Sequence, residues 1–126
     1  MPTRKKRRAE ETSLSKAIQQ VLTAKGCRVI RLQSGILPVL KGGKTAYVHC
    51  APKGTPDLLV ILPMTARVRL SAAEFTFVEV KKKTGKRSKE QTEFAEWAAL
   101  NGVRCIEARS ISEAIAGVFN TYAVSA

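Results

Sequence analysis

The sequence predicts a single α/β domain in which a mixed central β-sheet is flanked by helices on both faces. Its 126 residues are enough for one compact core and no second one. Apolar residues at helical spacing near the start are followed by a continuous apolar run that is typical of a buried central strand. A strand, a helix and a further strand come next, which predicts a right-handed parallel crossover.

The first half of the chain is expected to form a helix followed by strands. Residues 10–25 carry apolar side chains at helical spacing, and Gly26 ends that helix. A strand is expected at 27–32. Residues 36–50 indicate an irregular segment with a hairpin around a Gly-Gly turn, and the apolar run 57–62 predicts the central strand.

The second half is expected to complete the sheet and to add two helices. A loop at 63–73 leads to a strand at 74–81, and a helix follows at 88–100. A strand at 103–108 and a helix at 110–120 come last. The core order is therefore αβββαβ, closed by a final helix.

Two terminal stretches are expected to lie outside the folded domain. Residues 1–9 include five consecutive Arg or Lys residues without apolar periodicity, which predicts a disordered basic arm. The domain itself is expected to span 10–120. A weakly specified tail at 121–126 follows it.

The charge of the chain indicates a polyanionic partner. There are 22 Lys and Arg residues against 10 Asp and Glu, a net charge of +12. Nucleic acid is the commonest such partner, and a basic surface kept for solubility is the alternative. No apolar run approaches the ~20 residues of a membrane span, and no secretory signal is visible. We therefore expect no membrane partner and a cytoplasmic or nuclear location.

The cysteines and the histidine exclude several catalytic classes. The three cysteines are far apart, without a Cys-x-x-Cys motif, so neither zinc nor a disulfide framework is expected. His49 is the only histidine. It excludes multi-histidine metal sites, and any Ser-His-Asp triad that does not use His49 itself.

Two acidic residues and a lysine stand at the ends of two predicted neighbouring strands. Asp57 opens one apolar run, and Glu79 comes 22 positions later near the end of another, two residues before Lys81. If these ends converge, the two carboxylates can hold Mg²⁺ or Mn²⁺, with the Val80 carbonyl as a third oxygen ligand. Alternation places Glu79 and Lys81 on one strand face, where Lys81 would orient the attacking water or stabilise the charged transition state.

Each of these residues has a simpler interpretation that the sequence leaves open. Asp57 belongs to a Pro-Asp pair, which is common in turns. Glu79 and Lys81 also suit a salt-bridged pair on an exposed strand face, worth little energy. Gln91 stands three positions after Ser88 and can simply close a capping box at the helix N-terminus.

Together these residues resemble a known nuclease pattern. An Asp after proline, followed at a distance by Glu-x-Lys, is the pattern of the PD-(D/E)XK nucleases, and here it is formed by Asp57, Glu79 and Lys81. More narrowly, residues 10–118 are similar to the VRR-NUC family of virus-type replication and repair nucleases. The positions of this narrower resemblance are Arg31, Ser34, Gly35, Lys53–Asp57, Glu79–Lys81, Gly85, Ser88, Gln91, Gly102 and Ala108–Ser110.

The resemblance implies a PD-(D/E)XK restriction-endonuclease-like core and a metal-dependent endonuclease that acts on DNA. Asp57 and Glu79 match the metal-ligand positions of the family. Lys81 matches its catalytic lysine, and Gln91 matches a helix glutamine near the site.

The resemblance also implies a glutamate on the first helix as a metal ligand. Glu11 is the choice because it shares a helical face with Leu14, Ile18 and Leu22, and Glu10 is the competitor. Stand-alone phage and bacterial members of the family are dimers that look like Holliday-junction resolvases. We therefore expect a homodimer that acts on branched or junction DNA in the cytoplasm of a bacterial or phage-infected cell.

Several polar side chains near the predicted site are candidates for DNA contact. They are Arg31, Ser34, Lys53, Lys82, Lys83, Lys86 and Arg87. A non-catalytic basic protein that binds DNA or RNA is the rival interpretation. A restriction-type or nicking nuclease with the same site is a third, which ranks lower because no separate sequence-reading module is visible.

Overall fold

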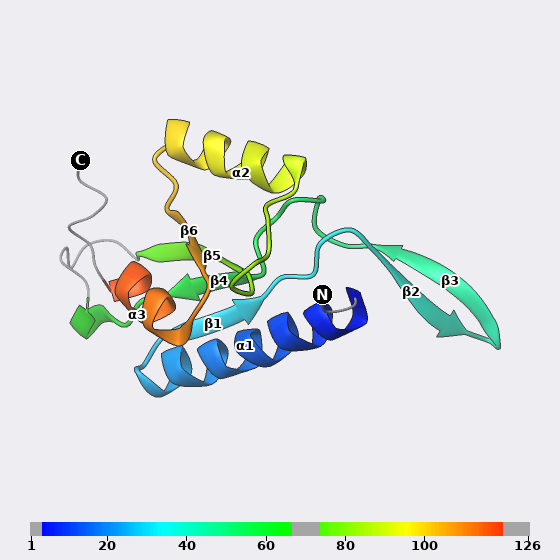
Figure 1. The fold of residues 1–126 in the computed structure, drawn as a ribbon, viewed down its shortest axis with the longest axis horizontal. Helices are drawn as coiled ribbons and strands as arrows, with labels where there is room; N and C mark the ends of the chain where they lie inside the picture. The colour runs from blue at the N-terminus through cyan, green and yellow to red at the C-terminus, as the bar shows by residue number, and fades with distance from the viewer. Residues whose placement is uncertain (1–3, 67–73, 120–126) are drawn as a thin grey trace.

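The structure, a computed structural model, describes residues 4–66 and 74–119 of the chain (Figure 1). The elements in chain order are α1 (Arg4–Ala24), β1 (Arg28–Arg31), β2 (Ile36–Lys41), β3 (Lys44–His49), β4 (Leu58–Ile61), the 3-10 turn η1 (Met64–Ala66), β5 (Phe75–Val80), α2 (Lys89–Leu100), β6 (Cys105–Ala108) and α3 (Ile111–Phe119). No helix in this described part of the chain is both long and apolar enough to cross a bilayer.

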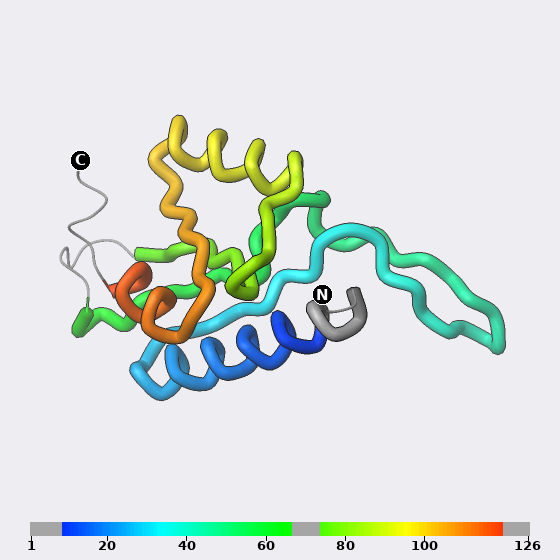
Figure 2. Tube along the Cα trace, viewed as in Figure 1, coloured from blue at the N-terminus to red at the C-terminus, as the bar shows by residue number. Residues whose placement is uncertain are grey.

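The central sheet has four strands in the order β1-β4-β5-β6. The β1–β4 and β4–β5 pairs are antiparallel, and β5–β6 is parallel. The predicted mixed sheet and the parallel strand–helix–strand passage through α2 are therefore confirmed. The predicted hairpin is also present, because β2 and β3 pair with each other in a separate two-stranded sheet that projects from the rest of the molecule (Figures 1 and 2).

The core lies between α1, α3 and one face of the sheet. Ile18 and Leu22 of α1 are fully buried with Val60, Val78 and Val118 from β4, β5 and α3. All five side chains are apolar, so burying them together stabilises the two helices against the sheet.

The other face of the sheet is covered by α2. Residues of β5 alternate between faces, so Phe77 points away from the buried Val78. Its ring lies 5.3 Å from the ring of Phe94 on α2, at 74°. Such edge-to-face pairs stabilise a contact beyond simple burial. The predicted covering of both sheet faces is confirmed, and α2 is fixed above the strand that carries Glu79.

The start of the first helix differs from the prediction. We expected a disordered arm over residues 1–9, but α1 begins at Arg4 and includes the basic run. Arg, Lys, Ala and Glu all have high helix propensity, so the helix extends beyond the residues that pack on the core. Residues 1–3 and the expected tail at 121–126 lie outside the described residues, as does most of the expected loop at 63–73. The expected domain limits 10–120 stay a prediction.

A close backbone contact ties the loop before Asp57 to α2. Gly54 has a φ of +94°, and a Cβ atom there would lie 2.5 Å from the backbone carbonyl of Glu90. We expect Gly54→Ala to lower the free energy of unfolding by about 2–4 kcal/mol, because strain and overlap add. Gly43→Ala is the matched control, since Gly43 has a φ of +77° with nothing within 4 Å. Urea unfolding measures both, and equal losses would show that the overlap at Gly54 is unimportant.

Candidate active site

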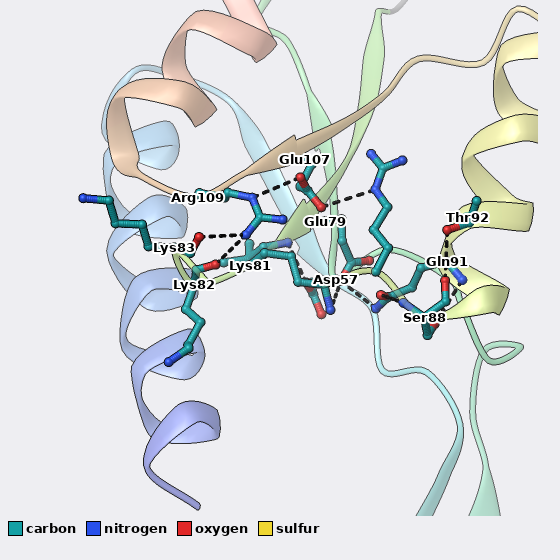
Figure 3. A network of polar contacts seen from close by, with 12 residues as sticks. Asp57, Glu79, Lys81, Lys82, Lys83, Ser88, Gln91, Thr92, Glu107 and Arg109 are labelled. Carbon is teal, nitrogen blue, oxygen red and sulfur yellow. Dashed lines mark hydrogen bonds and ion pairs between the residues drawn. The ribbon is translucent and has the colours of Figure 1, made fainter. Parts of the chain in front are cut away.

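The ends of β4 and β5 bring two carboxyl groups together, as the sequence predicted. Leu58 pairs with Val78 in the antiparallel ladder, so Asp57 and Glu79 occupy the next position along it. The Asp57 side chain accepts a hydrogen bond from the Val80 N–H at 2.7 Å, and its negative charge acts on the adjacent Glu79 carboxyl group. Figure 3 shows these carboxyl groups with Lys81 and Gln91 beside them.

Glu79 has an unusual protonation equilibrium. The residue is only 6% exposed. Burial, and after it the negative charge of Asp57, together raise the pKa of Glu79 from 4.5 to about 8, although Lys81 opposes the shift. Two crowded carboxyl groups share a proton unless a cation offsets their charge. The pair is therefore suited to bind a cation and to release a proton as it does so.

Two consecutive lysines point to different partners. The Nζ atom of Lys81 lies 3.8 Å from Glu79 Oε1, inside the site. The Nζ atom of Lys82 donates instead to Glu10 Oε2 on α1, at 3.2 Å. Lys82 is 9% exposed, so this ion pair joins the end of β5 to α1, and the side chain is not presented on the surface as a DNA contact would be. This differs from the expectation for Lys82.

Gln91 fills both of the roles that the sequence left open. Its side-chain Oε1 accepts a hydrogen bond from the backbone N–H of Ser88 at 2.8 Å. Its backbone N–H donates to Ser88 Oγ at 3.2 Å, so the capping box is formed. Its Nε2 donates at 3.0 Å to Glu79 Oε1. The first turn of α2 thus orients the Glu79 carboxyl group.

Two substitutions at Gln91 separate the roles. Gln91→Glu retains the acceptor that caps α2 but removes the donor to Glu79, whereas Gln91→Ala removes both. If cleavage of DNA depends on the oriented Glu79, both variants should lose cleavage by on the order of tenfold. Only Gln91→Ala should also lose about 1 kcal/mol of stability. Cleavage rates and urea unfolding of both variants measure these effects. Undiminished cleavage by Gln91→Glu would show that Gln91 only caps α2.

A cavity of about 200 Å³ opens between α1 and the sheet at this point. Its lining residues are Glu11, Thr12, Ser15, Lys16, Gln19, Arg31, Asp57 and Val80. Glu11 therefore faces the cavity with Asp57, whereas Glu10 is occupied by Lys82. Of the two glutamates that the sequence left in competition, the geometry favours Glu11. Glu79 does not line the cavity, but it lies next to Asp57, which does.

The donor set fits a hard cation that keeps most of its water. Within residues 4–66 and 74–119, no three His, Cys, Asp or Glu side chains are grouped closely enough to hold a metal ion. A cation bound at this point could take carboxylate oxygens from Asp57 and Glu79, and Glu11 is a further carboxylate that lines the cavity. The N–H and C=O of a strand residue point to the same neighbour, so the Val80 carbonyl faces the Asp57 side. Mg²⁺ commonly binds through one or two carboxylates and several waters.

The other predicted DNA-contact residues are spread around the site. Arg31 lines the cavity, and Ser34 forms an isolated β-bridge with Ala51. Lys53 is exposed and lies 3.7 Å from Glu90. Lys83 and Lys86 are exposed after β5, and the Nε of Arg87 donates to Glu107 Oε1 at 3.3 Å.

No role was assigned from the sequence to an ion pair at the end of β6, formed by Glu107 and Arg109. Glu107 lies directly opposite Glu79 in the parallel ladder, and its charge is offset by Arg87 and by Arg109, whose Nε donates to Glu107 Oε2 at 3.2 Å. The Nη1 of Arg109 donates to the carbonyl oxygens of Lys82 and Lys83, at 2.8 and 3.1 Å. Arg109, held by Glu107, thus stabilises the backbone directly after Lys81. The signal in the sequence is that Glu107 and Arg109 stand two positions apart, at the end of the predicted strand 103–108 and just after it.

Fold and site together define a class of protein: a mixed α/β domain in which the ends of two neighbouring strands bring together the half-buried Asp57, the buried Glu79 and a lysine. Comparison with solved structures then identifies a known domain with a similar fold. The chain is similar to a structure described as a "VRR_NUC domain", with 24% identity, a TM-score of 0.54, and coverage of 83% of this chain and 89% of that one. The resemblance recognised from the sequence is thus confirmed for the fold. No family model matches the sequence, and no curated protein matches it.

Proposed function

We propose that this protein is a metal-dependent endonuclease that hydrolyses phosphodiester bonds in DNA. One observation supports this above all others: the buried Glu79 carboxyl group lies beside the half-buried Asp57 carboxylate, with a lysine ammonium 3.8 Å from Glu79, in a chain of net charge +12. A protein that only binds a polyanion gains nothing from acidic groups that face it, because they repel the phosphates.

The residues divide the work of hydrolysis between them. Asp57, Glu79 and the Val80 carbonyl would hold Mg²⁺ or Mn²⁺. When bound there, the ion supplies a water of lowered pKa and offsets charge on the phosphoryl oxygens. Lys81, whose Nζ lies 3.8 Å from Glu79, would orient the attacking water or stabilise the negative charge of the transition state. Gln91 holds the Glu79 carboxyl group in one orientation.

The substrate is proposed to be branched DNA, cut by a homodimer as in a Holliday-junction resolvase. A junction presents two equivalent strands, and two symmetric active sites would cut them together.

Cleavage of a four-way junction, compared with linear duplex of the same sequence, tests the proposal. We expect cleavage in Mg²⁺ that a chelator stops, with preference for the junction, and sedimentation at the mass of two chains. DNA binding without cleavage in any divalent ion would favour the non-catalytic rival. A monomer that digests linear ends would remove the resolvase proposal, and a defined cut in linear duplex would favour the restriction-type or nicking alternative.

A further inference from the structure

The β2–β3 hairpin is held at a fixed place beside the candidate site. At its base, the Leu32 N–H donates to the Asp57 carbonyl at 2.7 Å. Gly35 N–H donates to Ala51 O at 2.9 Å, and Cys50 N–H donates to Gly35 O at 3.0 Å. Both chain segments that enter the hairpin are therefore hydrogen-bonded to each other, and one of them is bonded to the residue that would bind the metal. The hairpin itself extends outward from this point (Figure 1).

The charge of the hairpin is entirely positive. No Asp or Glu occurs between positions 26 and 56, although this stretch contains Arg28, Arg31, Lys41, Lys44 and Lys53. Lys41 and Lys44 pair directly across the tip, and both are exposed. Like charges directly opposite each other destabilise a two-stranded ribbon. An anion bound between them would remove this repulsion.

The hairpin also exposes large apolar side chains. Leu40 is 83% exposed and Tyr47 is 68% exposed, and both lie on one face, which also carries Pro38 opposite Tyr47. Leu37 and Val48 pair on the opposite face and are exposed as well. A two-stranded hairpin alone is marginally stable in water, and a contiguous exposed apolar surface marks a contact with another molecule.

The shape of the hairpin suits a groove of DNA. Six residues per strand at ~3.4 Å each give a ribbon about 20 Å long, and the major groove, which is ~12 Å wide, admits a two-stranded β-ribbon. In the minor groove, apolar side chains can wedge between base steps and bend the duplex. A basic tip with neighbouring Leu and Tyr side chains supplies both the phosphate contacts and the apolar contacts.

We propose that the β2–β3 hairpin is a DNA-binding ribbon that lies in a groove next to the bond to be cut. Lys41 and Lys44 bind phosphates on either side of the groove, and the face with Leu40 and Tyr47 contacts the sugars and bases. This inference rests on the proposed function. A second copy of the chain is the competing occupant, but the tip of one copy would meet another chain that also carries +12.

The test measures DNA affinity against salt concentration in chelator, where cleavage does not interfere. The variant is Lys41→Gln/Lys44→Gln, and the matched control is Lys25→Gln/Arg28→Gln. Both control residues are exposed: Lys25 directly follows α1, and Arg28 is the first residue of β1. The junction of α1 and β1 lies on the side of the molecule opposite the hairpin (Figure 1). Each released phosphate contact lowers the slope of log K against log salt by about 0.9. We expect the tip variant to lose about 2 units of slope and at least tenfold in affinity, and the control to lose neither.

A second variant, Leu40→Ser/Tyr47→Ser, tests the apolar face by the same assay together with sedimentation. We expect weaker DNA binding at unchanged mass. A change from dimer to monomer with unaltered affinity per chain would assign the hairpin to a second copy and overturn the proposal. Equal slopes for the tip variant, the control and the unchanged protein would also overturn it. Cleavage by the unchanged protein in Mg²⁺ is measured separately, so a failed nuclease proposal is distinguished from a failed hairpin proposal.

Discussion

Asp57→Asn is expected to reduce DNA cleavage at least a thousandfold, which corresponds to about 4 kcal/mol of transition-state stabilisation. Asn retains the size of the side chain and an oxygen that can accept the hydrogen bond of the Val80 N–H, so the fold should be unchanged. It removes one of the two charges that would hold the cation. Single-turnover cleavage of a four-way junction at saturating protein measures the effect.

DNA affinity separates this loss from general damage. Asp57→Asn should bind the junction as tightly as the unchanged protein or slightly more tightly, because a negative charge that faced the phosphates is gone. Glu96→Gln, an exposed position on α2, is the matched control and should cleave normally. Weaker binding together with undiminished cleavage would contradict the assignment of Asp57.

Glu79 is expected to make the stability of the metal-free protein fall as pH rises. Its pKa is about 8 in the folded protein, above its ordinary value of 4.5, chiefly because the carboxyl group is buried. Between these values the folded chain retains a proton that the unfolded chain has lost. Stability is therefore highest below about pH 4.5 and decreases towards pH 8, by up to about 1.4 kcal/mol per pH unit from this group.

A divalent cation should reverse this trend, since it favours the ionised carboxylate. We expect stabilisation by Mg²⁺ to be larger at pH 8 than at pH 6, and Glu79→Gln to lose both the pH dependence and the effect of Mg²⁺. Urea unfolding at the two pH values, with Mg²⁺ or with chelator, measures this, and Glu96→Gln again serves as the control. The same pH slope in Glu79→Gln would show that another group is responsible.

The sequence was sufficient to predict the order of elements and the main pair of acidic residues. The spacing of apolar residues distinguishes the helix α1 from the strands β4 and β5. The strand after Asp57 is buried, so it must have neighbouring strands, and β5 is the next apolar strand along the chain. Because side chains alternate along a strand, the positions of Glu79 and Lys81 on one face also followed from sequence alone.

Other features depend on contacts that local pattern does not encode. The choice between Glu10 and Glu11 needed the position of Lys82, which bonds Glu10 from β5. The role of the Glu107–Arg109 ion pair could be recognised only from the register of β5 against β6, because this register pairs residues that are far apart in the chain. The hairpin pattern predicted that β2 and β3 pair, but their apolar residues did not reveal that both faces stay exposed.

Calorimetric titration of Mn²⁺ at pH 7, in two buffers of different ionisation enthalpy, tests the central claim most directly. The claim is that Asp57 and Glu79 bind one hard divalent cation together. The unchanged protein should bind Mn²⁺ and release the proton of Glu79, whereas Asp57→Asn and Glu79→Gln should each lose that binding. Binding of equal strength in all three proteins, or no binding in the unchanged one, would contradict it.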